Sequence, residues 1–117
     1  MSFQNPFPGL DKPLNRQDLI SAIRLDIAAE NEATFLYQSH AQACQKDFPE
    51  VAEILRDIAT EEIVHTGELT EVLRSVSLDG ILLDQGKDEV KKKFPDLEYK
   101  VGMIKKEFRY DMDDLKR

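Results

Sequence analysis

The feature that most constrains the fold is a stretch from Asn15 to about Lys46 that contains neither glycine nor proline. The stretch is rich in good helix formers, and Asn15 stands three residues before Asp18, where an N-cap residue is expected. The sequence therefore predicts one long helix, which at 1.5 Å per residue would be roughly 45 Å long.

A second helix is expected directly after the first. Pro49 suits a first helical turn, and Asp47 and Glu50 have the spacing of a capping box, so this segment should end one helix and begin the next. The second helix should run to about Ser75. Two such helices joined by a short turn form an antiparallel hairpin.

The rest of the chain also favours helices. After a turn at residues 77–80, a short charged helix is expected around Lys87–Lys93, and a last helix from Asp96 to about Leu115. No stretch shows the alternation of a strand, so the predicted fold class is all-α. The predicted organisation is an irregular, proline-containing arm (1–14), the helical hairpin (15–75), and a turn with C-terminal helices (76–117).

Steps of three and four residues along each long helix mark an apolar stripe with a polar centre. The first stripe comprises Ile20, Ile23, Ile27, Glu30, Thr34, Tyr37, Ala41 and Cys44. The second stripe comprises Val51, Leu55, Ile58, Glu62, His65, Leu69 and Val72. Because a turn centred near Lys46 lies sixteen residues from both Glu30 and Glu62, the hairpin should bring the two carboxylates to one level.

This polar layer predicts a dinuclear metal site. A buried carboxylate must be neutralised, paired or bound to metal, and neither stripe contains a lysine or arginine. Glu62 and His65, at i and i+3, can direct an oxygen and a nitrogen toward one point, and Glu30 can join them from the neighbouring helix. Four-helix di-iron proteins use one glutamate and one Glu-x-x-His pair from each half of the bundle.

Counting ligands predicts that two chains share the site. One chain supplies a single Glu-x-x-His pair, whereas the four-helix site needs two, and the expected last helix contains no histidine. We therefore expect a homodimer that completes a four-helix bundle, because a twofold contact brings each ligand together with its own copy.

Simpler roles remain open for several of these residues. Glu62 and His65 could be a solvated helix pair, and a lone histidine is more often a hydrogen-bonded core residue than a ligand. Tyr37 is expected in the core with its hydroxyl bonded to the carboxylate layer. His40 is expected at the surface or in a dimer contact, and Cys44 is most simply a small apolar residue.

The composition narrows the partners. A formal charge of −7 opposes binding to nucleic acid or to an anionic membrane surface and favours small cations. A single cysteine excludes an internal disulfide and a cysteine-rich metal site. No signal-like start and no apolar run long enough to span a membrane are present, so a cytoplasmic protein is expected.

Beside these patterns, three segments resemble the ferritin-like superfamily, and within it the half-size group that includes encapsulated ferritins: ENEATFLY at 30–37, PEVAEIL at 49–55 and EEIVH at 61–65. The likeness covers about residues 15–75. In encapsulated ferritins and rubrerythrins a glutamate seven residues before a tyrosine is the first-helix ligand, which maps onto Glu30 and Tyr37. The number of residues from the loop proline to the Glu-x-x-His pair also matches, so this pair maps onto Glu62 and His65.

The resemblance implies a ferroxidase-like oxidoreductase that binds two iron ions per dimer and oxidises Fe(II) with oxygen or peroxide. Manganese or zinc would be substitutes. Glu30 and His65 would be terminal ligands, Glu62 a bridge, and Tyr37 a neighbour of the ligands. The acidic entry site of encapsulated ferritins is partly matched by Glu32, and the acidic neighbours of the ligands, such as Glu61, could line the same route.

Partners and alternatives follow from the same resemblance. The partners would be a second copy of the chain, a higher ring or cage, and an encapsulin shell that encloses the protein. The C-terminal segment Phe108–Arg117 contains no shell-docking tail that we identify. A rubrerythrin-like peroxide scavenger is a related alternative, although the cysteine-rich electron-transfer module of rubrerythrins is absent from the sequence. A non-catalytic helical dimer or scaffold that binds metal structurally is the alternative from another class.

Overall fold

The computed structural model describes residues 12–107, which form four helices: α1 (Arg16–Cys44), α2 (Pro49–Val76), α3 (Asp79–Lys93) and α4 (Leu97–Glu107). This range contains no strand, so the predicted all-α class is confirmed. None of these helices combines the length and the apolar character needed to cross a membrane. Most of the predicted arm and the end of the predicted last helix lie outside the described residues.

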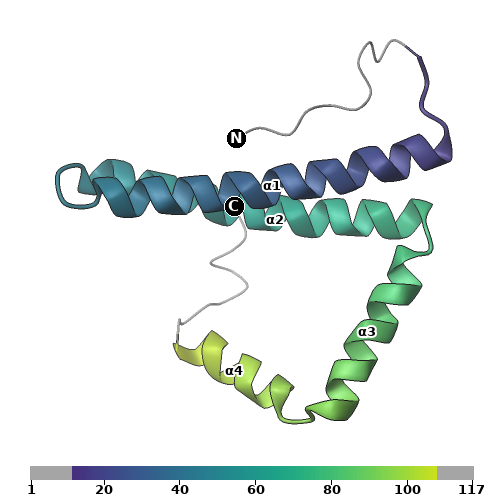
Figure 1. Cartoon of the computed structure of the whole chain (residues 1–117). Coiled ribbons are helices and arrows are strands. Elements are labelled where there is room, and N and C mark those ends of the chain that lie inside the picture. Colours follow the sequence, from purple (N-terminus) through teal and green to yellow (C-terminus); the bar gives the residue numbers. More distant parts are fainter. Residues whose placement is uncertain (1–11, 108–117) are drawn as a thin grey trace. The chain divides into compact units, whose positions relative to one another are not determined.

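The chain divides into two compact units, Met1–Gly80 and Ile81–Arg117. In the first unit, α1 and α2 lie side by side and antiparallel as a hairpin (Figure 1). The start of α1 is capped as predicted, because the Asn15 side-chain oxygen accepts a hydrogen bond from the Asp18 N–H at 2.8 Å. In the second unit, Phe94, Pro95 and Asp96 separate α3 from α4.

The turn between α1 and α2 differs in detail from the prediction. Pro49 is the first residue of α2, as expected, but the N-cap position is Phe48 and no side chain caps it, so the predicted Asp47 capping box is wrong. The turn is too short for that box. The Phe48 N–H donates to the Cys44 carbonyl at 2.8 Å, and the Phe48 carbonyl already accepts from the Ala52 N–H at 3.0 Å.

The helix α3 begins earlier than predicted, at Asp79 rather than near Lys87. The Ser77 hydroxyl accepts from the Asp79 N–H at 3.1 Å and so caps the new helix, while the Asp79 carboxylate pairs with Arg24 of α1 at 2.8 Å. Gly80 therefore lies within the first helical turn. A Cβ at Gly80 would lie 3.0 Å from the Arg74 Cγ atom, so a larger residue there would require the Arg74 side chain to shift.

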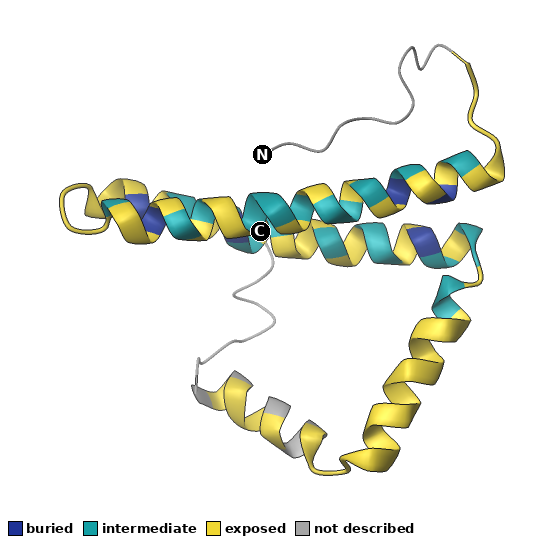
Figure 2. Ribbon diagram, viewed as in Figure 1, coloured by how far each residue is buried: buried dark blue, intermediate teal, exposed yellow. Residues whose placement is uncertain are grey.

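Burial in the hairpin follows the sides of α1 and α2 that face each other (Figure 2). Every member of the first stripe is buried or half-buried, as its periodicity predicted. Ile20, Ile23 and Leu73 form a cluster at the end away from the turn, and Ala41 and Ala52 are buried near the turn. The half-buried centre of the first stripe contains its carboxylate.

The second stripe is only partly correct. Its members Leu55, Glu62 and Leu69 are half-buried, but Val51, His65 and Val72 are exposed, and α2 instead buries Ala52, Ala59 and Leu73. The periodicity correctly predicted that α2 has a buried side, but that side is centred on other residues than the predicted stripe. Small alanines let the two helices approach closely, whereas the prediction had favoured the larger apolar side chains.

A core substitution tests this packing. Leu73→Ala should lower the free energy of unfolding by about 2–4 kcal/mol, because it opens a cavity in the cluster with Ile20 and Ile23. The matched control is Leu78→Ala, since Leu78 is 73% exposed and Leu73 only 5%. Urea unfolding followed by circular dichroism measures both, and equal losses would contradict the assigned core.

Candidate metal centre

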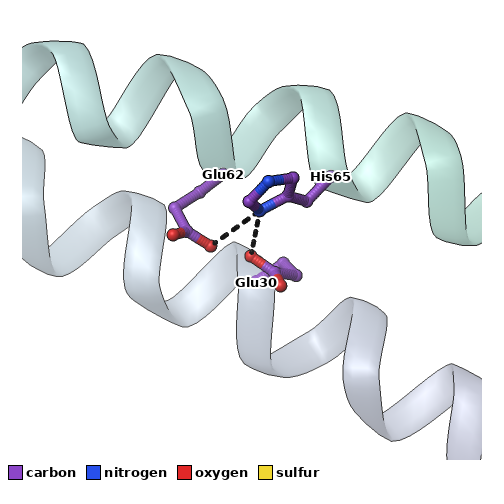
Figure 3. Close-up of side chains that lie close together, drawn as sticks. All are labelled: Glu30, Glu62 and His65. Atoms are coloured by element: carbon purple, nitrogen blue, oxygen red, sulfur yellow. Dashed lines mark ion pairs between the residues drawn. The ribbon is translucent and has the colours of Figure 1, made fainter.

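Three side chains from the two long helices converge near the middle of the hairpin (Figure 3). Glu30 comes from α1, and Glu62 and His65 come from successive turns of one side of α2. The His65 Nδ1 atom lies 3.7 Å from the Glu30 Oε2 atom and 3.7 Å from the Glu62 Oε2 atom. The two carboxylates thus meet at one level, as the equal distances from the turn predicted.

The separations suit atoms that share a metal ion. At 3.7 Å, nitrogen and oxygen are too far apart for a good hydrogen bond. An ion that binds nitrogen and oxygen at about 2.0–2.2 Å holds neighbouring ligand atoms roughly 3–3.5 Å apart. One ligand atom from each of Glu30, Glu62 and His65 lies within 4.8 Å of the other two, so small side-chain adjustments would bring all three onto one ion.

Of the three side chains, the Glu30 carboxylate points most clearly to cation binding. Its Oε2 atom is buried, and among the described residues it has no hydrogen-bond donor. A buried carboxylate oxygen that accepts no hydrogen bond is costly. A divalent cation would compensate this oxygen, and carboxylate with imidazole is a donor set that accepts iron, manganese and zinc.

One side of the group remains open in a single chain. The His65 side chain is 47% exposed, while the Glu30 and Glu62 side chains are 25% and 18% exposed. The histidine thus lies toward the surface, on the same side of α2 as the exposed Val72 two turns further along. The three ligands of one chain therefore leave coordination positions on a bound ion open to further ligands.

The other residues singled out from the sequence lie outside this group. Tyr37 is half-buried on α1, Glu32 is half-buried, and Glu61 is exposed. His40 is exposed, as expected, and Cys44 is half-buried near the Ala41 carbonyl. In the part of the chain that the structure describes, the only cluster of three or more histidine, cysteine or acidic residues with this geometry is Glu30, Glu62 and His65.

Two threonines next to the group were not recognised from the sequence as part of the site. The Thr34 hydroxyl donates to the Glu30 carbonyl at 2.9 Å, and the Thr66 hydroxyl donates to the Glu62 carbonyl at 3.1 Å. The signal for them is a Glu-x-x-x-Thr spacing that occurs once in each helix and begins at the two level glutamates.

Comparison with known families places this geometry in context. The rubrerythrin family model matches residues 22–107, which is most of the chain. The chain belongs to the rubrerythrin family. This confirms the resemblance to the ferritin-like superfamily, and the matched range includes Glu30, Glu62 and His65. Like the rubrerythrin family as a whole, the protein is thus expected to bind iron through a helical bundle.

One curated relative adds a second finding about this rubrerythrin-family chain. It is 32% identical over 97 residues to a protein of Pyrococcus furiosus described as a ferritin-like-encapsulin shell fusion protein. The alignment covers 83% of the chain but only 28% of the relative, so the chain spans little more than a quarter of that protein. No solved structure gives a significant match.

Proposed function

We propose that the protein is a ferroxidase: a pair of chains binds two iron ions through Glu30, Glu62 and His65 of each chain, and Fe(II) is oxidised there. The observation that carries the proposal is the convergence of these three side chains around a buried Glu30 oxygen that has no hydrogen-bond donor among residues 12–107 as described. Membership of the rubrerythrin family supports iron as the metal.

The proposed reaction uses Fe(II) as its substrate. Two Fe(II) ions lose one electron each, and the two electrons with two protons reduce O2 to H2O2. Carboxylate oxygens favour the more highly charged Fe(III), so Glu30 and Glu62 would make this oxidation easier. The helices hold the ligands at one level, and Tyr37, half-buried on α1, is proposed to lie beside them.

Pairing of two chains follows from the ligand count. One chain brings two carboxylates and one imidazole, which is half of the set used in four-helix di-iron sites. A twofold axis through the site would supply the second set and let each Glu62 bridge both ions. The partly exposed His65 marks the side of the hairpin where the second chain would approach.

An exposed apolar surface beside His65 supports this pairing. We call it the outer stripe: Val51, Ile54, Ile58, His65 and Val72, which recur along α2 in steps of three, four and seven residues. Ile58 is half-buried and the other apolar members are 45% exposed or more. A second copy of the chain would cover this apolar surface, because the surface continues from a metal site that one chain only half completes.

We further propose that the protein works inside an encapsulin shell within the cytoplasm. The support is the name of the Pyrococcus relative, which describes a ferritin-like part and a shell in one chain. If the proposal holds, the chain should co-purify with a shell protein from its source, while a particle preparation without the chain would contradict it.

Stopped-flow absorbance is the test of ferroxidase activity. The protein is mixed with Fe(II) and then with O2 or H2O2, and Fe(III) formation is compared with that of free Fe(II) at the same pH. Faster oxidation by O2 supports the ferroxidase. Acceleration by H2O2 alone would favour the peroxide scavenger, and no acceleration by either would leave only a metal-binding scaffold.

Zinc should inhibit the reaction. A site of carboxylates and imidazoles discriminates poorly among divalent ions by affinity alone, so Zn(II) should occupy the positions of Fe(II) and cannot be oxidised. We expect Zn(II) at two equivalents per pair of chains to suppress most of the rapid phase. Unchanged Fe(II) oxidation with excess Zn(II) would show that oxidation occurs away from Glu30, Glu62 and His65.

A further inference from the structure

Each of the two ligand glutamates has a threonine four residues after it on the same helix. Thr34 follows Glu30 on α1, and Thr66 follows Glu62 on α2. Both threonines are half-buried, and both donate their hydroxyl to the backbone carbonyl of the glutamate one turn before, at 2.9 and 3.1 Å. The same Glu-x-x-x-Thr unit thus occurs twice, once on each side of the polar layer.

We propose that Thr34 and Thr66 are positioning residues for the metal centre. A threonine bonded to the carbonyl four residues earlier often bends a helix slightly at that point. The bond therefore influences the direction in which the glutamate side chain leaves the backbone. This inference rests on the proposed metal site and adds to it the two residues that set the orientation of its carboxylates.

The direction of these hydrogen bonds also matters to the ligands. Because each hydroxyl hydrogen is given to a backbone carbonyl, it is not given to a carboxylate. The buried Glu30 Oε2 atom accordingly has no donor among the described residues. Thr34 and Thr66 thus support the two glutamates through the backbone and leave the carboxylate oxygens available to cations.

The chain contains a matched control for this proposal. Thr60 and Thr70, both on α2, donate in the same way to the carbonyls of Arg56 and Thr66, at 3.1 and 2.7 Å. Neither of these carbonyls belongs to a carboxylate ligand. Replacing Thr60 and Thr70 therefore removes the same type of hydrogen bond without touching the backbone of Glu30 or Glu62.

The experiment measures Co(II) binding by visible absorption, with Co(II) as the probe in place of iron. The double variant Thr34→Val/Thr66→Val should bind Co(II) at least about tenfold more weakly, which is the usual cost of losing a group that orients a ligand. The pair Thr34→Ser/Thr66→Ser keeps the hydroxyls and should bind within about threefold of the unchanged chain. The control Thr60→Val/Thr70→Val should also bind Co(II) within about threefold of the unchanged chain.

Thermal unfolding of the metal-free variants separates positioning from stability. If the affinity of the Thr34→Val/Thr66→Val variant falls only as far as that of Thr60→Val/Thr70→Val, or if the serine variant does not retain binding, the positioning role is overturned. If instead the unchanged chain fails to bind Co(II), the proposed metal site itself is wrong. The two failures are therefore distinguishable in one titration series.

Discussion

Replacing Glu62 with alanine is expected to abolish the binding of two metal ions by a pair of chains. In the proposed site Glu62 bridges both ions, so a symmetric pair would lose two bridging carboxylates at once. Loss of a group that only orients a ligand weakens metal binding 10–100-fold, and loss of a bridging ligand should exceed about a hundredfold. Isothermal titration with Co(II) or Zn(II) measures both stoichiometry and affinity.

The matched control is Glu53→Ala. Glu53 lies on the same helix nine residues earlier, which is about half a turn around α2, and it is exposed. The Glu53→Ala substitution removes one negative charge from α2 without touching the polar layer. Two ions should still bind with little change in affinity, and an equal loss in both variants would refute the role assigned to Glu62.

The second large effect concerns pairing of the chains. Ile54→Asp should weaken the proposed dimer by more than about a hundredfold, because an unpaired charge in an apolar contact costs several kcal/mol and each pair carries the change twice. Ile54 belongs to the outer stripe and is 59% exposed in a single chain, so the hairpin itself should fold normally. The binding of two metal ions should be lost together with the dimer.

Ile63→Asp provides the control for the pairing. Ile63 is the same residue type, lies on the same helix and is 53% exposed, but it is nine residues from Ile54 and so faces the opposite side of α2. It is also closer than Ile54 to Glu62 in sequence. Sedimentation velocity should show pairs for the Ile63 variant and single chains for the Ile54 variant, and the reverse result would place the partner on the other face.

Much of the hairpin could be predicted because its signals are local. Absence of glycine and proline, the Asn15 cap and the proline at 49 predicted two long helices with ends near those observed. The equal distances of Glu30 and Glu62 from the turn predicted their common level, since that prediction depends only on helical rise. The geometry brings both together with His65.

The remaining features depend on contacts between distant residues. Which side of α2 faces α1 depends on how closely the helices approach, and this favoured Ala52, Ala59 and Leu73 over larger neighbours. At the early start of α3, Asp79 pairs with Arg24, which is fifty-five residues away in the chain. Periodicity along one helix contains no information about either contact.

Sedimentation equilibrium at low protein concentration, with Zn(II) and with a chelator, tests the central claim that two chains complete one metal site. Two divalent ions would neutralise four carboxylates brought together from both chains, so metal should tighten the dimer, and chelation should release single chains. The expected result is a dimer that binds two ions. The dissociation constant of the two chains should rise at least about tenfold on chelation. A stable single chain that binds two ions, or a dimer whose affinity is the same with Zn(II) and with chelator, would contradict the account.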